Sequence, residues 1–370
     1  MARPSSPVRY AVIGLGHIAQ GAMLPAFGHA RRNSVLTALL SNEPEKLEKL
    51  GRRYQVEHLC HYEAADELFA SGAVDAVYIA LPNNLHREWT IRAARAGLHV
   101  LCEKPMAVSA RECQQMIRAA RDNKVKLMIA YRLHFERANL EAAQLARSGK
   151  LGELRFFSSD FSLQVRSNNI RLERELGGGP LYDIGIYCIN AARYCLNDDP
   201  VAVWAMATKS DDRRFREVEE TVVAAMRFKD ERVASFTCSF GAADRSVYTI
   251  TGTKGSVTVD PAYEYAEGLA YEVRSGERKR RKRFAKSDQF AAELIYFSDC
   301  VLSGRDPEPS GEEGLIDVRA IEGMQRSIRS GRWVSLGPTQ RRRRPSLRQE
   351  IRRPAVPQEP RLVHAAPSSQ

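Results

Sequence analysis

The sequence contains no long apolar stretch and no paired cysteines, and each absence excludes a class of protein. No apolar run approaches the roughly 20 residues that a membrane-spanning helix requires. The first ten residues show no apolar signal core. The seven cysteines are scattered without a CxxC pair, which argues against a disulfide framework or a zinc cluster. We therefore expect a cytoplasmic protein with reduced thiols and no metal.

The positive charge is concentrated near the end of the chain. Residues 337–370 contain eight arginines against Glu350 and Glu359, which gives this tail +6 of the net charge of +11. The tail is rich in proline and arginine and has few apolar residues, so we expect it to be disordered. A second basic run, Arg278–Arg283, is expected to form a solvated loop or a sheet edge. Neither run has interleaved aromatic residues, and neither is typical of a nucleic-acid or membrane interface.

The first third of the chain alternates strand-like and helical patterns. Buried-type strands end near Ile13, Leu40, Leu81, Cys102 and Ala130, and amphipathic segments separate them. Such alternation predicts α/β architecture with a doubly wound parallel sheet, here a Rossmann domain over residues 1–131.

After Gly149 the pattern changes to successive strands with few helices between them. The expected strands are Glu153–Leu163, Val201–Thr208, Thr221–Phe228, Arg232–Phe240, Ser246–Thr251 and Ser256–Val259. Helices are expected near 181–196, 288–302 and 312–329. This order predicts an α+β domain with a large, mostly antiparallel sheet over residues 132–336, followed by the disordered tail, 337–370.

A glycine-rich turn after the first strand predicts a dinucleotide site. Gly14-Leu-Gly16-His-Ile-Ala19 ends a strand and opens a helix, so its backbone can approach a pyrophosphate at the helix N-terminus. An NAD-binding protein usually has an acidic residue at the end of the second strand. This chain has Ser41 there, with Lys46 five residues later, a pair that suits the 2′-phosphate of NADP. Glu43 lies between them, so NAD remains possible.

Two further strand ends carry polar residues at the carboxyl edge of the predicted sheet, where open α/β folds bind ligands. Glu103-Lys104-Pro105 follows a buried strand, and its lysine could activate a hydroxyl beside a nicotinamide; the alternative is a solvated ion pair at a strand end. Pro82 and Asn83, after the preceding strand, are placed to border the nicotinamide ribose. His86 could belong to that site or simply to the turn.

The second catalytic candidate lies on the helix expected after Gly177-Gly-Gly-Pro180. Asp183 and Tyr187 are four residues apart and share one face. A tyrosine hydroxyl, with a pKa of about 10 in solution, is a poor base, but an adjacent ammonium and a nicotinamide cation stabilise a phenolate. Lys104 and Tyr187 belong to different predicted domains, so the site should close at their interface. The alternative for Tyr187 is a buried aromatic residue with a satisfied hydroxyl.

With these motifs the chain resembles the glucose–fructose oxidoreductase / inositol dehydrogenase (Gfo/Idh/MocA) family, and within it the glucose–fructose oxidoreductase branch. The resemblance covers roughly residues 8–331. The matching segments are Gly14–Gly16, Ser41 with Lys46, Val77–His86, Cys102–Met106, Tyr131–His134, Gly177–Tyr187, Val218–Glu220 and Ser310–Arg319.

The resemblance implies a nicotinamide-dependent oxidoreductase that acts on a sugar or polyol, with Lys104 and Tyr187 in the proton transfer. Catalytic residues are then Lys104, Tyr187 and Asp183, and substrate-binding residues are these three with Arg132. Predicted cofactor-binding residues are Gly14, Gly16, His17, Ile18, Ser41, Lys46, Leu81, Pro82, Asn83, His86, Glu103, Lys104 and Arg132.

We therefore predict a cytoplasmic, NADP-preferring sugar or polyol dehydrogenase that forms a homodimer or homotetramer. Asp183 is expected to orient the sugar, and Arg132 to line the pocket. Two alternatives stay open. One is a reductase of oxidised sugars or a dihydrodiol-type enzyme. The other is a non-catalytic cofactor-binding regulator that uses its basic tail to reach an anionic partner, although such a protein has no chemical reason to keep Lys104, Asp183 and Tyr187 together.

Overall fold

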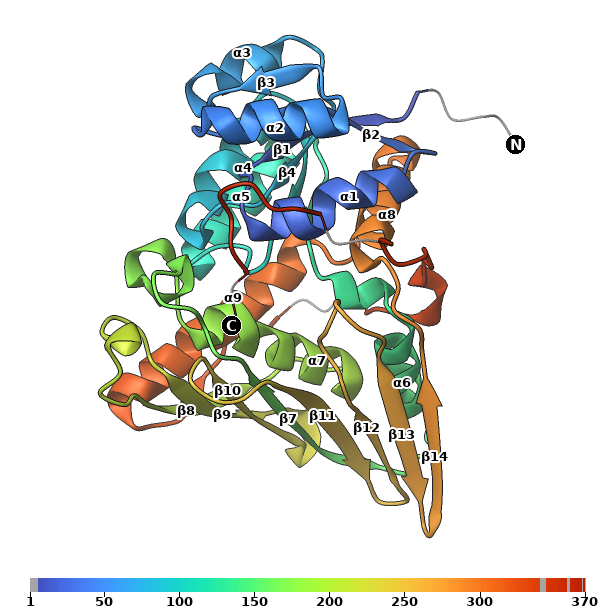
Figure 1. Ribbon diagram of the computed structural model, residues 1–370. Helices are drawn as coiled ribbons and strands as arrows, with labels where there is room; N and C mark the ends of the chain where they lie inside the picture. The colour runs from blue at the N-terminus through green and yellow to red at the C-terminus, as the bar shows by residue number, and fades with distance from the viewer. Residues whose placement is uncertain (1–5, 340–343, 358–359, 368, 370) are drawn as a thin grey trace.

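The first sheet consists of six parallel strands in the order β3-β2-β1-β4-β5-β6. Its strands are β1 Val8–Ile13, β2 Ser34–Leu40, β3 His58–Cys60, β4 Ala76–Ile79, β5 His99–Cys102 and β6 Leu127–Ile129. The central strands β1 and β4 are mostly apolar and almost wholly buried because helices cover both faces of the sheet. This computed structural model describes residues 6–339, 344–357, 360–367 and 369 (Figure 1).

The helices around the first sheet come from both ends of the chain. The local ones are a π-helical turn Ala19–Met23, α1 Leu24–Ala26, α2 Pro44–Tyr54, α3 Ala65–Ala70, α4 His86–Arg95 and α5 Ala110–Asp122. A late helix, α8 Gln289–Ser303, packs on β1 and β2, and the Tyr10 and Ser298 hydroxyls lie 2.7 Å apart. The first core is therefore completed by a helix that the division at residue 132 assigns to the second domain.

The second sheet has nine strands in the order β14-β13-β12-β11-β7-β10-β9-β8-β15, and only β7 and β10 pair in parallel. Its strands are β7 Leu154–Ser162, β8 Ala202–Thr208, β9 Thr221–Arg227, β10 Val233–Ser239, β11 Arg245–Gly252, β12 Ser256–Val259, β13 Ala270–Ser275, β14 Arg278–Arg283 and β15 Val334–Ser335. The predicted fold class is confirmed: a parallel Rossmann sheet is followed by a mostly antiparallel one.

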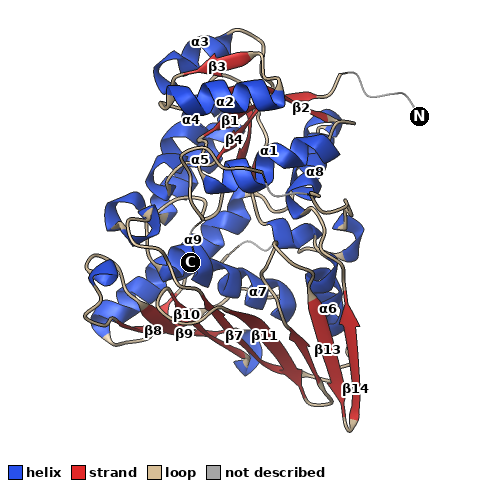
Figure 2. Cartoon of the chain, viewed as in Figure 1, coloured by secondary structure: helices blue, strands red, loops and turns tan. Residues whose placement is uncertain are grey.

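Three helices lie between the two sheets and cover one face of the second (Figure 2). They are α6 Arg137–Arg147, α7 Ile186–Leu196 and α9 Gly311–Ser330. The helix expected over 181–196 begins as a π-helical turn, Leu181–Gly185, and continues as α7. No α-helix of the described chain covers the opposite face, where Phe156, Met206 and Val233 stay 42%, 47% and 45% exposed.

The basic run Arg278–Arg283 forms β14, an edge strand whose residues are almost all exposed. Its side chains are solvated, as expected, and Lys282 also pairs with Glu141 at 2.6 Å. In the part of the chain that the structure describes, no helix is long and apolar enough to cross a membrane.

The described residues of the predicted tail, 337–339, 344–357, 360–367 and 369, include several that contact the body of the protein, and its disorder stays a prediction. The Arg344 side chain is 6% exposed and pairs with Asp199 and Glu313 of the body. Farther on, Gln349 donates to the Glu308 carboxylate at 2.8 Å, and Val363 is buried. Composition counts apolar area and gives no information about such contacts, whereas buried acidic groups of the body bind Arg344. The rest of the predicted tail (340–343, 358–359, 368 and 370) lies outside the described residues.

Candidate active site

The glycine turn after β1 has the backbone geometry that a dinucleotide site needs. Gly14 has φ +91°, and a Cβ there would lie 2.5 Å from the Ala80 oxygen, so only glycine fits. A Cβ on Gly16, by contrast, would meet no described atom within 4 Å, which leaves the turn open to an approaching pyrophosphate. His17 and Ile18 follow at the start of the π-helical turn, where backbone N–H groups face outward.

The end of β2 brings together the residues predicted to choose between NADP and NAD. The Ser41 hydroxyl accepts a hydrogen bond from the Glu43 N–H at 3.1 Å. Lys46, on the first turn of α2, is 7% exposed, and its ammonium pairs with the Glu43 carboxylate. Glu43 thus holds the lysine next to Ser41 and is itself partly neutralised by it.

The catalytic candidates Lys104 and Asp183 meet between the two domains, as predicted. The Lys104 ammonium donates to the Asp183 main-chain oxygen at 2.9 Å and to its carboxylate Oδ1 at 3.2 Å. Burial acts against the ammonium, yet the acidic groups Tyr187, Asp183 and Glu103 hold the pKa of Lys104 above its usual value. Lys104 is therefore a charged ammonium in the resting site.

Tyr187 lies beside this pair and between two cations. Lys104 Nζ is 4.8 Å from the centre of the Tyr187 ring, and the Arg132 guanidinium is 5.1 Å from it. Phe161 packs edge-on against the ring at 5.6 Å between centroids. The lysine thus faces the ring, and the hydrogen bonds of its ammonium run to Asp183, whereas the sequence suggested a position beside the hydroxyl. Both cations contact the electron-rich face of the ring.

Arg171 is part of the site and was missed from the sequence. It lies in a short 3-10 turn, Ile170–Leu172, after β7, and its Nε donates to Asp183 Oδ2 at 2.6 Å. Burial raises the pKa of the Asp183 carboxyl, but Arg171 and Lys104 outweigh that effect and lower it to about 2. Both carboxylate oxygens are thus occupied by cations. A loop arginine outside any motif gives no local signal, so only the fold reveals it.

Contacts with residues of the second domain hold Arg132 in place. It lies in a buried 3-10 turn, Arg132–Phe135, and donates to the main-chain oxygens of Tyr263 and Glu264 and to the Gln289 side chain. Its guanidinium also stacks over Tyr265 at 5.2 Å from the ring centre. These contacts hold a positive charge at the domain interface, next to Tyr187.

Glu103 and His86 support the lysine from within the first domain. Tyr78 donates its hydroxyl to Glu103 at 2.5 Å, and burial raises the pKa of Glu103. The two ring nitrogens of His86 lie 2.8 and 2.9 Å from the main-chain oxygens of Pro105 and Leu81. Burial lowers the pKa of His86. The ring ties together the segments after β4 and β5, and a contact of His86 with a cofactor stays a prediction.

Asn83 connects the two domains across the site. Its amide donates to the Gly177 main-chain oxygen at 2.8 Å. Gly177 has φ +81°, and a Cβ there would come within 2.5 Å of Val108 and 2.8 Å of Asn83. The segment from Leu81 to Asn83 is only partly buried, so it stays accessible at the edge where a nicotinamide ribose is expected.

Comparison with known proteins agrees with this geometry. Residues 8–131 match the family model of the oxidoreductase family with an NAD-binding Rossmann fold, and residues 139–258 match the GFO/IDH/MocA C-terminal domain. The D-xylose 1-dehydrogenase (NADP+) of Haloarcula marismortui is 32% identical over 338 residues, which cover 90% of this chain and 94% of that protein.

Two solved structures are similar along almost the whole body. The aldose–aldose oxidoreductase from Caulobacter crescentus, complexed with glycerol, is 40% identical with a TM-score of 0.85, covering 89% of this chain and 100% of its own. A 3-ketoreductase from Actinomadura kijaniata, in complex with NADP and TDP-benzene, is 28% identical with a TM-score of 0.80, covering 87% and 98%. Sequence, fold and site together place this chain in the Gfo/Idh/MocA family of oxidoreductases.

Proposed function

We propose that this oxidoreductase transfers hydride between NADP and a hydroxyl-bearing carbon of a sugar or polyol, with an aldose as the leading substrate class. The observation that carries the proposal is the group formed by Lys104, Asp183 and Tyr187 at the domain interface, with an ammonium 2.9 Å from the Asp183 main chain and 4.8 Å from the tyrosine ring. The named relatives, a xylose dehydrogenase and an aldose–aldose oxidoreductase, support the sugar class.

The preference for NADP rests on the end of β2. Ser41 offers a hydroxyl and Lys46 an ammonium, and a 2′-phosphate takes both kinds of contact, whereas a carboxylate at position 41 would repel it. Two of the relatives carry NADP in their names or were solved with it. When bound, the cofactor supplies the hydride acceptor.

The residues of this chain would handle the proton. During oxidation, the O–H proton of the substrate passes to the Tyr187 oxygen in its phenolate form, while the C–H hydrogen leaves as hydride; reduction runs the same transfer backwards. Lys104 and Arg132, both charged and within about 5 Å of the ring, stabilise the phenolate.

Asp183 has a task besides the predicted one. Lys104 donates to one of its oxygens and Arg171 to the other, and since each carboxylate oxygen has two acceptor sites, the predicted contact with a sugar hydroxyl stays open. We therefore assign it as a positioning residue that fixes the lysine, while Arg171 fixes the aspartate.

The experiment is to incubate the full chain with NADP or NAD and a panel of aldoses and polyols, and to follow the reduced cofactor by its near-ultraviolet absorbance. Turnover of at least one aldose, lost in Lys104→Met, is expected. If no sugar is oxidised but a keto-sugar or dihydrodiol substrate is converted, the reductase or dihydrodiol alternative replaces the proposal. A cofactor that binds without any turnover would favour the regulatory alternative.

A further inference from the structure

We propose that the C-terminal residues 360–367, together with Ser369, form a strap that crosses the mouth of the dinucleotide site and slows the release of the cofactor. The proposal rests on NADP as the cofactor, but not on the identity of the sugar. It explains why a basic tail is held against the body at so many points (Figure 1).

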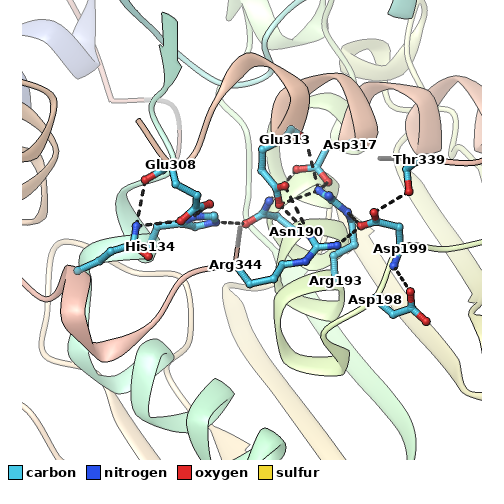
Figure 3. A network of polar contacts seen from close by, with 11 residues as sticks. His134, Asn190, Arg193, Asp198, Asp199, Glu308, Glu313, Asp317, Thr339 and Arg344 are labelled. Atoms are coloured by element: carbon cyan, nitrogen blue, oxygen red, sulfur yellow. Dashed lines mark hydrogen bonds and ion pairs between the residues drawn. The ribbon is translucent and has the colours of Figure 1, made fainter. Parts of the chain in front are cut away.

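The first part of the tail is anchored in a buried ionic cluster. Thr339 donates to Asp199 at 2.7 Å, and Arg344 pairs with Asp199 and, at 3.1 Å, with Glu313. The same acidic groups bind Arg193 of α7, so the tail arginine completes a network that otherwise contains more acidic than basic groups (Figure 3).

The tail then follows the outside of the body toward the first domain. Gln349 donates to the Glu308 main-chain oxygen at 3.0 Å, and the Asp288 N–H donates to the Arg353 oxygen at 3.1 Å. Pro354 forms an isolated bridge with Ser287. These contacts direct the chain toward α8 and the glycine turn.

The strap itself begins where the chain reaches α2. Arg53 donates to the Arg361 main-chain oxygen at 2.7 Å. Gln20 then pairs with Val363 in both directions: its amide donates to the Val363 oxygen at 2.9 Å, and its oxygen accepts from the Val363 N–H at 2.7 Å. The same amide donates to the Leu15 oxygen at 2.8 Å, inside the glycine turn. One side chain therefore couples the strap to the loop that holds the pyrophosphate.

The next residue reaches the end of β2. His364 Nε2 lies 3.0 Å from the Glu45 carboxylate and its Nδ1 lies 3.7 Å from Glu43, the residue that holds Lys46. The strap thus runs from the pyrophosphate turn to the segment expected to bind the 2′-phosphate. A bound dinucleotide would lie along the same path.

The strap ends on the other domain. Ser369 forms a bridge with Val165, and its main-chain oxygen accepts from Arg166 Nε at 2.7 Å. Ser369 is five positions after His364, and at about 3.5 Å per position the chain between them spans at most roughly 18 Å. A segment this short, fixed in both domains, cannot swing away without losing one anchor. Release of the cofactor should therefore require that an anchor breaks.

The test measures NADP release without any sugar, so its result is independent of the substrate. Load the full chain with NADP, add excess competitor and follow the rate of release. A chain that ends at Pro360 keeps the Arg344 anchor and lacks the strap; we expect it to release NADP at least about 10-fold faster, within the usual range of coupling between two bound groups. Retained circular dichroism shows that it is folded.

A matched pair of full-length variants keeps the test valid if the shortened chain does not fold. Val363→Asp places a charge at a buried strap position, whereas Ala366→Asp places the same charge at an exposed one three residues away. Val363→Asp should speed release like the truncation, and Ala366→Asp should behave like the unmodified chain. In a second readout, saturating NADP should slow trypsin cleavage after Arg361, because coupling is reciprocal.

Two outcomes would overturn the proposal. Equal release rates in all four proteins would show that the segment lies on the surface without affecting the release of NADP. Tighter NADP binding by the shortened chain would show that the segment competes for the site. An unmodified chain that binds NAD and not NADP would refute the proposed cofactor. The release experiment would then be repeated with NAD, and its result would decide whether the strap acts.

Discussion

Individual side chains decide the chemistry of this site, and Tyr187 is the one most easily tested. Tyr187→Phe removes the hydroxyl and keeps the packing against Phe161. If the hydroxyl carries the proton, turnover should fall by about 10²–10⁴-fold while NADP affinity persists. Lys104→Ala should be at least as damaging, and the double variant should lose much less than the product of the two losses, because the residues act as one unit. Near-normal turnover by Tyr187→Phe would leave Lys104 as the leading base.

Cofactor choice is a second question at the scale of the residue. Ser41→Asp places a carboxylate where the 2′-phosphate of NADP is expected, and like charges in contact cost several kcal/mol. The dissociation constant for NADP should rise by at least about 10-fold, and that for NAD much less. Titration of both cofactors against both proteins measures this. An unmodified chain that already prefers NAD contradicts the assignment of Ser41 and Lys46.

The paired carboxylate of Asp183 should make stability depend on pH. Its pKa is lowered to about 2, so the ionised form stabilises the fold above the unfolded value of about 3.9, and this contribution disappears as the pH falls toward 2. The unmodified chain and Asp183→Asn should differ in stability. At pH 7, ionisation accounts for on the order of 2 kcal/mol of that difference. Thermal unfolding at a series of pH values should show the difference shrinking below pH 4. A difference that does not change with pH would mean that Asp183 is not paired in the folded protein.

At the scale of elements, the tail shows which structural features a local sequence pattern predicts and which it does not. The Rossmann strands and the six strands expected in the second domain were recognisable because each has a local hydrophobic pattern. The position of α8 was not, because nothing in Gln289–Ser303 says which sheet it will cover. The contacts of the tail could not be predicted for the same reason: the partners of Arg344, Asp199 and Glu313, are far away in the sequence.

Some residues of the site could be predicted from the sequence and others could not. Lys104, Asp183 and Tyr187 stand in compact motifs, and their proximity follows from the edge of the parallel sheet and one helix face. Arg171 and Val363 stand in no motif. Their roles arise from loops that are brought to the site by the whole fold, and such placement has no local signature.

The anchor at Arg344 can be tested as an element. Among the described residues, Arg344→Met leaves Asp199 and Glu313 with Arg193 as their close cation, and it should destabilise the fold by about 3 kcal/mol, as removal of one member of a buried ion pair does. The melting temperature should drop by roughly 5 °C or more. Arg348→Met, at an exposed position in the same segment, is the control and should change little. Equal effects of the two substitutions would contradict the anchor.

At the scale of the whole molecule, the uncovered face of the second sheet predicts self-association. Val233 is directly opposite Phe156 on the neighbouring strand, and Met206 is opposite Val223, so exposed apolar side chains form adjoining pairs. Exposed apolar pairs on a sheet face that no helix covers often pack against a partner. We expect a homo-oligomer, and Met206→Asp should shift it toward the 41.5 kDa single chain in light scattering. An unmodified protein that scatters as one chain at micromolar concentration contradicts this.

The two edges of the same sheet limit the shape of such an assembly. At one end β14 presents a row of lysine and arginine side chains, and at the other β15 is only two residues long. The charges of β14 disfavour the addition of another strand at that edge. At the other edge β15 pairs only with Ala202 and Val203 of β8. We therefore expect copies to associate through the sheet face rather than through its edges. Contact is left to the flat face, and a face that meets its own copy closes on itself by a twofold axis. We therefore expect growth to stop at a small closed assembly, in which the apolar face of each nine-stranded sheet is covered by a partner.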